Sequence, residues 1–158
     1  MAEAGVICVA VSGGVYGIAV DEVQEVIGYR PPTRVFHAPA AMAGIMSLRG
    51  EVLPIIDLAQ LLGASGELVA SEPADPRVVV VRERAAARRR VGLKVDALLG
   101  MRDFSSAHRV EVPTAIAARL GDLVTGVVSE PAPAFALLSV AGILNAPPLR
   151  ELSGAFVG

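Results

Sequence analysis

Residues 44–63 read GIMSLRGEVLPIIDLAQLLG, and this stretch holds the clearest structural pattern in the chain. Two apolar runs, 44–48 and 51–56, predict a pair of strands joined by a tight turn at Arg49-Gly50. Asp57 follows the second strand and is a suitable N-cap for a short amphipathic helix. The stretch therefore predicts a unit made of a strand, a turn, a second strand and a helix.

A weaker copy of this unit occurs 82 residues further along the chain. The matching residues are Gly44, Ile56, Leu58 and Leu62 in the first copy, and Gly126, Leu138, Val140 and Leu144 in the second. Residues 17–21 (GIAVD) are similarly echoed by residues 92–96 (GLKVD). Internal similarity at a fixed offset indicates that the fold contains two related halves.

Short apolar runs separated by turn residues continue along the chain, which contains 16 glycines and 11 prolines. This punctuation predicts a mostly β fold of about ten strands with few short helices, arranged as two small barrels. Within a single domain of 158 residues, we expect one barrel at about 15–76 and the other at about 77–145. The strand 6–12 and the tail 145–158 are expected to pack across them.

The composition favours a well-packed protein of the cytoplasm. Hydrophobic residues make up 53% and charged residues 19%, and no apolar stretch approaches the roughly 18 residues of a membrane helix. The N-terminus shows no secretory signal or myristoylation site. A net charge of −2 disfavours nucleic acid and anionic membranes as partners. The single cysteine, Cys8, rules out an internal disulfide and is expected to be a small buried apolar residue.

No pattern of residues points to catalysis, a metal or a cofactor. His37 and His108 are far apart and lack ligands at metal-binding spacing. Asp21, Asp57 and Asp96 each follow a strand, where helix capping explains them without acid–base chemistry. We therefore expect a binding protein rather than an enzyme.

The sequence RERAAARRR at 82–90 is the one dense basic run. It could contact an acidic partner, lipid headgroups or RNA, or it could form a solvated hairpin loop. We favour the loop because no aromatic residues are interleaved for base stacking.

Glu25 lies between apolar residues, and Arg49 lies at the turn between two core strands. If these strands adjoin, the two charges could form a half-buried, bidentate ion pair. They could equally be independent surface charges that contribute little. Their spacing does not decide between these alternatives.

Several blocks in order resemble the CheW family of chemotaxis coupling proteins. They are YGIAVDEVQEVI at 16–27, RV at 34–35, AP at 38–39, GIMSLRGEVLPIIDL at 44–58, VGLKVD at 91–96 and the closing residues Gly126, Leu138 and Leu144. The resemblance runs from about Val6 to Leu144. It is highly specific in the first half, where the spacing between blocks also agrees, and moderate in the second.

The resemblance implies two five-stranded, SH3-like β-barrels and a non-enzymatic, cytoplasmic adaptor at membrane-associated receptor clusters. Such an adaptor links the cytoplasmic helical hairpin of chemoreceptors, docked in a groove between the barrels, to the regulatory domain of a CheA-type histidine kinase. No receiver or kinase domain accompanies the module in this sequence. Two alternatives remain open at this point: a specialised scaffold of gliding or pilus motility with weak kinase contact, and a small ligand-binding or enzymatic barrel.

By position, the resemblance assigns six residues to the receptor groove: Val23, Glu25, Gly44, Arg49, Leu98 and Met101. It places Glu25 and Arg49 where the family has an interacting charged pair. Gly92 and Gly126 fall at family glycine positions, which suggests close backbone approach. The chain departs from the family at Ser139, where Asp is frequent, at the turn 129–133 and in the basic loop 84–90.

Overall fold

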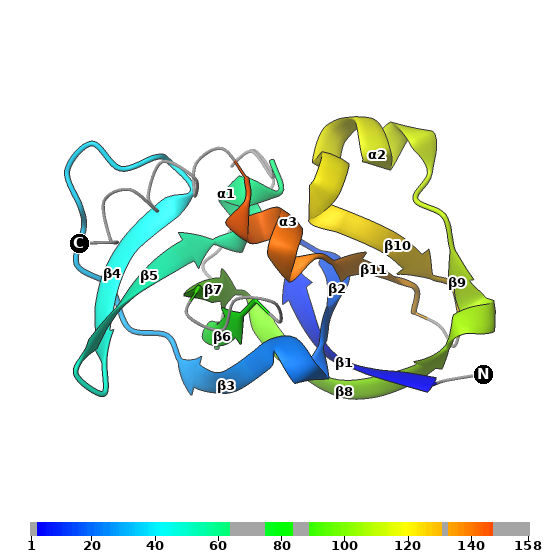
Figure 1. Ribbon diagram of the computed structural model, residues 1–158, viewed down its shortest axis with the longest axis horizontal. Helices are drawn as coiled ribbons and strands as arrows, with labels where there is room; N and C mark the ends of the chain where they lie inside the picture. The colour runs from blue at the N-terminus through cyan, green and yellow to red at the C-terminus, as the bar shows by residue number, and fades with distance from the viewer. Residues whose placement is uncertain (1–2, 64–74, 84–88, 131–132, 147–158) are drawn as a thin grey trace.

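The computed structural model describes residues 3–63, 75–83, 89–130 and 133–146. These residues form two β-sheets that lie side by side (Figure 1), which confirms the predicted mostly β fold. The first sheet has the order β3 (Val23–Gly28), β6 (Arg77–Arg82), β7 (Arg90–Val95), β5 (Glu51–Asp57) and β4 (Met42–Leu48). The second has the order β8 (Ala97–Ser105), β1 (Glu3–Val11), β2 (Gly14–Ala19), β11 (Phe135–Leu138), β10 (Val124–Val128) and β9 (Arg109–Val110).

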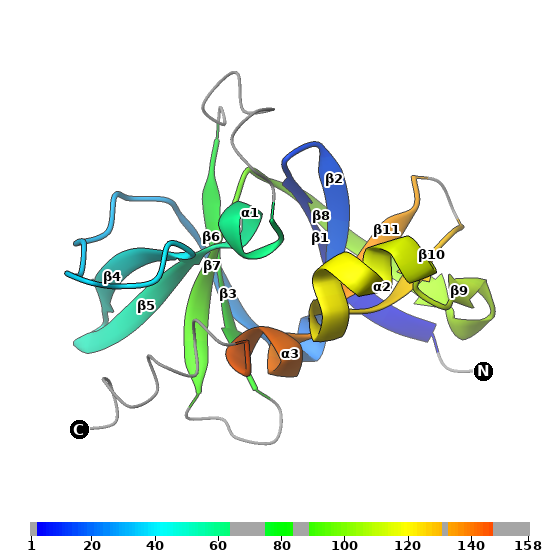
Figure 2. The same cartoon turned by 90° about the horizontal axis from the view of Figure 1, so that it is seen from above.

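The helices are short. They are α1 (Leu58–Leu61), α2 (Thr114–Leu120) and α3 (Val140–Leu144), with 3-10 turns η1 (Val20–Glu22), η3 (Ser106–His108) and η4 (Gly121–Leu123). Both α1 and α3 lie near the middle of the molecule, between the two groups of strands (Figure 2). In the part of the chain that the structure describes, no helix has the length and apolar character needed to span a membrane.

The two sheets repeat one another in register. In the first sheet, Ile55 of β5 pairs with Gly44 of β4 on one side and with Gly92 of β7 on the other. The counterparts in the second sheet pair in the same way: Leu137 of β11 lies between Gly126 of β10 and Gly17 of β2. The duplication inferred from the sequence is therefore a duplication of strand pairing.

The strands of each sequence half are nevertheless shared between the two sheets. The hairpin β1–β2 pairs with β8 and β11, whereas the hairpin β6–β7 pairs with β3 and β5. The expected division near residue 76 separates the two repeats, but it does not separate the sheets. The chain passes from one sheet to the other at η1, between β2 and β3, and at Asp96, between β7 and β8. Neither place contains a positive-φ residue of the kind that a two-residue hairpin turn requires.

The strand β6 shows why the sheets interlock. Val78 and Val80 point into a cluster inside the first sheet, and Val79 and Val81 point the other way into a cluster shared by both sheets. Its counterpart β1 divides its side chains similarly between the interior of the second sheet and the shared cluster. Because side chains alternate along a strand, an uninterrupted run of valines marks a strand that is buried on both faces.

Three of the predicted local features are confirmed. Arg49 (φ 50°) and Gly50 (φ 81°) form the two-residue turn between β4 and β5. Asp57 caps α1 by accepting hydrogen bonds from the backbone N–H groups of the second and third residues after it, at 3.1 and 3.4 Å. Ser139, which stands where the family often has Asp and can cap a helix nearly as well, caps α3 by accepting from the N–H of Gly142 at 2.9 Å.

The other two aspartates do not cap helices as expected. Asp21 lies inside η1, whose N-cap residue is Ala19. Asp96 instead accepts a hydrogen bond at 2.8 Å from the backbone N–H of Ser12, in the turn between β1 and β2. This hydrogen bond therefore joins the β1–β2 turn of the first repeat to the β7–β8 connection of the second. The tail beyond residue 146 lies outside the described residues, so its expected packing is not described.

Candidate functional site

Glu25 and Arg49 form an ion pair. Nη1 of Arg49 lies 2.7 Å from Oε2 of Glu25, within the range of a charge-assisted hydrogen bond. The Glu25 side chain is only 20% exposed, whereas that of Arg49 is 69% exposed. Oε1 of Glu25 is buried and has no hydrogen-bond partner, so Arg49 is the partner that compensates this carboxylate. Of the two alternatives left open by the sequence, the structure contains the ion pair, but through one carboxylate oxygen rather than bidentately.

This ion pair also shows that the first sheet is strongly curved. Glu25 belongs to β3 and Arg49 follows β4, and these strands are the two opposite edges of the five-stranded sheet. Contact between the two edges requires the sheet to curl, as in a small barrel. The pair therefore acts as a clasp between the first and last strands.

The other surface residues assigned by resemblance lie on or beside the two equivalent edge strands, β3 and β8. Leu98 and Met101 on β8 are 40% and 68% exposed, although both are large apolar side chains. Val23 on β3 is half-buried against the shared core. Both strands run along the lower side of the molecule in Figure 1. We call Val23, Glu25, Arg49, Leu98 and Met101 the β3/β8 surface.

Gly44 does not belong to this exposed surface. It is buried in β4, its φ is +151°, and a Cβ placed there would collide with the backbone carbonyl oxygen of Thr33. The N–H and C=O groups of Ile45 hydrogen-bond with Thr33 at 2.8 Å in both directions. Gly44 therefore permits the segment before β4 to pack on this strand, and its assignment to the receptor groove stays a prediction.

Gly92 and Gly126 are also buried. A Cβ at Gly92 would lie 2.6 Å from Cγ1 of Val78, and one at Gly126 would lie 2.7 Å from Nε of Arg109. Neighbouring atoms therefore approach both glycines closely: side chains at Gly92, and at Gly126 both the Arg109 side chain and the carbonyl oxygen of Val110, which a Cβ would meet at 3.4 Å.

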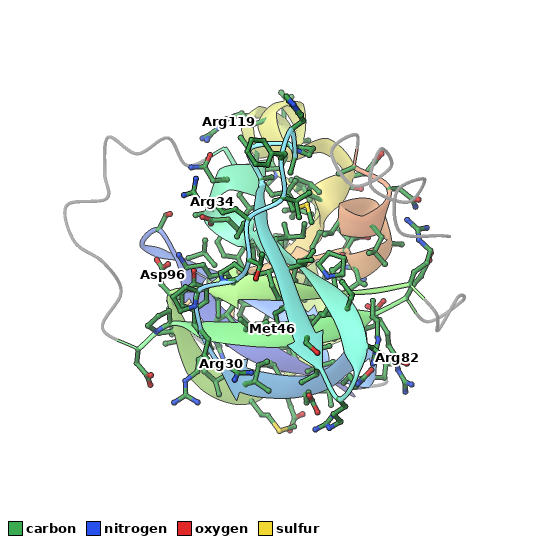
Figure 3. The ribbon with its side chains drawn as sticks, turned by 90° about the vertical axis from the view of Figure 1, so that its left-hand side faces the viewer. Arg30, Arg34, Met46, Arg82, Asp96 and Arg119 are labelled. Carbon is green, nitrogen blue, oxygen red and sulfur yellow. The ribbon has the colours of Figure 1, made fainter. Side chains whose placement is uncertain are left out.

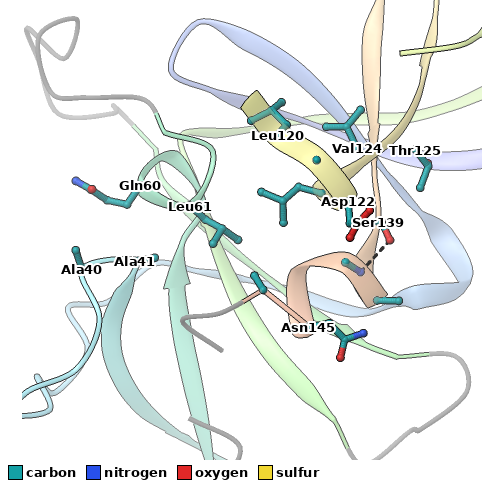
Figure 4. A pocket seen from close by; sticks show the side chains of 15 residues that line it. Ala40, Ala41, Gln60, Leu61, Leu120, Asp122, Val124, Thr125, Ser139 and Asn145 are labelled. Carbon is teal, nitrogen blue, oxygen red and sulfur yellow. Dashed lines mark hydrogen bonds between the residues drawn. The ribbon is translucent and has the colours of Figure 1, made fainter. Parts of the chain in front are cut away.

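The interior of the seam between the sheets is not an open groove. The shared cluster fills it with side chains from β1, β6, β7, α1 and α3. A pocket of about 990 Å³ opens elsewhere along the seam, between Leu61 of α1 on one side and Leu120, Val124 and Asn145 on the other (Figure 4). None of the six residues assigned by resemblance lines this pocket. The residues of the β3/β8 surface therefore lie apart from this pocket.

The described residues contain no cluster of three or more His, Cys, Asp or Glu side chains that could hold a metal ion. The ring of His37 lies against Phe36, and His108 Nε2 lies 3.8 Å from Glu130. Cys8 is buried, as predicted, and burial raises the pKa of its thiol although nearby Arg102 lowers it in part. A buried neutral thiol is a poor nucleophile.

The basic run is partly used inside the fold. Arg89 donates hydrogen bonds to the carbonyl oxygen of Leu144 at 2.6 Å and to the side chain of Asn145 at 3.2 Å, and it also pairs with Glu83. Arg90 pairs with Glu51. Arg82 is exposed and points outward at the edge of the molecule (Figure 3). Residues 84–88 lie outside the described residues.

Sequence reasoning missed the second set of contacts beside the clasp, which involves Gln24, Glu51 and Arg90. These residues are far apart in the chain and carry no local motif. Their proximity depends on the order of strands in the first sheet, which the sequence did not reveal.

The fold defines a class of protein in which two duplicated, interlocked β-sheets pack on a shared core. A family model described as a CheW-like domain matches residues 5–148. The chain therefore belongs to the CheW-like domain family.

Curated relatives agree with this membership. The "Probable chemotaxis protein CheW" of Rhizobium etli is 48% identical over 77 residues, which are 48% of this chain and 45% of the relative. The "Chemotaxis protein CheW" of Bacillus subtilis is 30% identical over 105 residues, or 66% of this chain and 62% of the relative. The matched part thus spans about half the length of the Rhizobium protein.

A solved structure supports the fold. The scaffolding protein TtCheW from Thermoanaerobacter tengcongensis superposes with a TM-score of 0.79, covering 93% of this chain and 96% of that one, at 20% identity. At this identity the likeness establishes the fold.

Proposed function

We propose that this protein is a non-enzymatic scaffold that couples the cytoplasmic tips of chemoreceptors to a CheA-type histidine kinase. Support comes from membership of the CheW-like family and from relatives named as chemotaxis and scaffolding proteins. It acts in the cytoplasm, at receptor clusters on the membrane. Its contribution is to hold two partners at once, so that a signal on one surface changes the partner on the other.

The observation that carries this proposal is the exposure of large apolar side chains on the edge strand β8. Met101 is 68% exposed and Leu98 is 40% exposed, a few residues apart on one strand. Apolar side chains in such a row match the spaced apolar residues along one face of a helix. The helical hairpin at a receptor tip provides that kind of face.

The ion pair of Glu25 and Arg49 supplies the polar part of the β3/β8 surface. Arg49 reaches solvent while remaining held by Glu25, so its free N–H groups can donate to a partner in a fixed orientation. A preorganised side chain loses less conformational entropy on binding. We assign the kinase regulatory domain to a separate surface of the first barrel.

The test uses the full chain, a receptor cytoplasmic fragment and a CheA-type kinase. Met101→Asp should weaken receptor binding by at least tenfold and should lower receptor-stimulated kinase activity. Phe36→Asp is the matched control for receptor binding, because Phe36 is 90% exposed but lies in the loop between β3 and β4. If the unmodified protein binds neither partner, or if both variants bind the receptor fragment equally well, the proposal is wrong.

A further inference from the structure

Arg90 makes two contacts that bridge separate parts of the first sheet. Its guanidinium forms an ion pair with Oε2 of Glu51, at the start of β5. Its Nη1 also donates a hydrogen bond to Oε1 of Gln24 on β3, at 3.4 Å. The Arg90 side chain is 22% exposed and that of Glu51 is 66% exposed, so the bridge lies at the surface of the sheet.

The residues that Arg90 contacts are next to the clasp. Gln24 directly precedes Glu25, and Glu51 is separated from Arg49 only by Gly50. The pair Glu25–Arg49 and the bridge Gln24–Arg90–Glu51 therefore join the same two elements, the strand β3 and the turn between β4 and β5. The turn is held from two directions.

A β-bulge accounts for the two neighbouring contacts on β3. Val23 pairs with Val81 and Glu25 pairs with Val80, so Gln24 is an extra residue in the ladder. A bulge redirects side chains and increases the local twist of the strand. In this bulge, Glu25 contacts Arg49 at the turn directly, and Gln24 is linked to the turn through Arg90 of β7.

We infer that Arg90 is a positioning residue for Arg49: by holding Glu51 and Gln24, it fixes the turn so that the Arg49 guanidinium stays on Glu25. Arg49 needs this support because it has a positive φ of 50° at a turn of only two residues. Without Arg90, the turn would lose the bridge to Gln24 and would keep the pair of Glu25 with the largely exposed Arg49. The consequence for receptor binding rests on the function proposed above, whereas the consequence for the turn does not.

The test compares variants of the full chain labelled with ¹⁵N. Arg90→Ala removes the bridge. The double variant Glu51→Arg with Arg90→Glu restores an ion pair in which the two charges have exchanged positions. Arg82→Ala is the matched control, because Arg82 lies directly opposite Arg90 in the ladder but is exposed. The readouts are the Nε–Hε signal of Arg49, the hydrogen-exchange rate of the Glu51 amide and the affinity for a receptor cytoplasmic fragment. Arg49→Lys identifies the Arg49 signal by removing it.

Arg90→Ala should move the Arg49 signal towards that of a free arginine and should speed exchange at Glu51 by about two- to fivefold. Receptor affinity should fall by a similar factor. Arg82→Ala should change none of these, and the exchanged pair should return the Arg49 signal towards its original position. A purely structural role would alter the melting temperature without changing the Arg49 signal selectively.

An unchanged Arg49 signal and unchanged Glu51 exchange in Arg90→Ala would overturn the inference, as would failure of the exchanged pair to restore the signal. If the turn responds as expected but the unmodified protein does not bind the receptor fragment, the proposed function fails and the positioning role stands.

Discussion

Replacing Arg49 by alanine should lower the free energy of unfolding by about 1 kcal/mol. Ion pairs on the surface contribute about 0.2–1 kcal/mol, whereas removing one partner of a buried pair costs about 3–5 kcal/mol. The pair here lies between these limits but nearer the first, because Arg49 is 69% exposed although Glu25 is 20% exposed. For a chain of this size, the melting temperature should fall by about 2–4 °C.

A second variant, Arg49→Asn, removes the same charge but also relieves the backbone cost of the left-handed conformation. Arg49 has a φ of 50°, a region that asparagine tolerates better than alanine. Arg49→Ala should therefore cost about 1 kcal/mol more than Arg49→Asn. Glu25→Gln is the complementary change, since it removes the charge while keeping the shape of the side chain.

The assay is a double-mutant cycle built from Glu25→Gln and Arg49→Asn, with stability measured by urea denaturation. We expect a coupling energy of about 0.5–1 kcal/mol that decreases as salt is added. A coupling energy below about 0.3 kcal/mol would show that the two charges act independently. The barrel edges would then be held together by apolar packing alone, and the clasp interpretation would be refuted.

Three further predictions concern other parts of the fold. Gly44→Ala should lower stability by about 2–4 kcal/mol in urea denaturation, because of the positive φ and the collision with Thr33; a loss below about 0.5 kcal/mol would contradict this. Arg89→Ala should cost about 1–2 kcal/mol by removing a cation from the C-terminal end of α3, and an unchanged urea midpoint would disprove that role. Because the pKa of Cys8 is raised in the folded state, the unfolded chain loses the thiol proton first, and stability should decline as pH rises above the ordinary value near 9.0. Cys8→Ala should show a smaller decline over the same range, and an identical decline would exclude the thiol as its cause.

Local features were predictable because neighbouring residues determine them. The turn at Arg49-Gly50 needs positive φ, which glycine supplies, and the cap at Asp57 needs only an acceptor before a helix. Each of these predictions depended on a few consecutive residues.

The candidate site was predictable only in part. The resemblance placed Glu25 and Arg49 together, but the residues alone left an ion pair and two separate charges equally open. That choice depends on whether the edges of the sheet meet. Arg90 was not found at all, since it reaches the clasp only through the order of strands in the sheet.

The sequence by itself determined the repeated strand-and-helix unit with its turn at Arg49-Gly50 and its cap at Asp57, because these follow from short-range sterics and hydrogen bonding. Only the tertiary structure decided which sheet each hairpin joins, because the valine run 78–81 is apolar on both faces and does not specify what covers either one. The exchange of hairpins between the halves fills the seam, leaves Leu98 and Met101 exposed on an edge strand, and brings distant charges together around one turn.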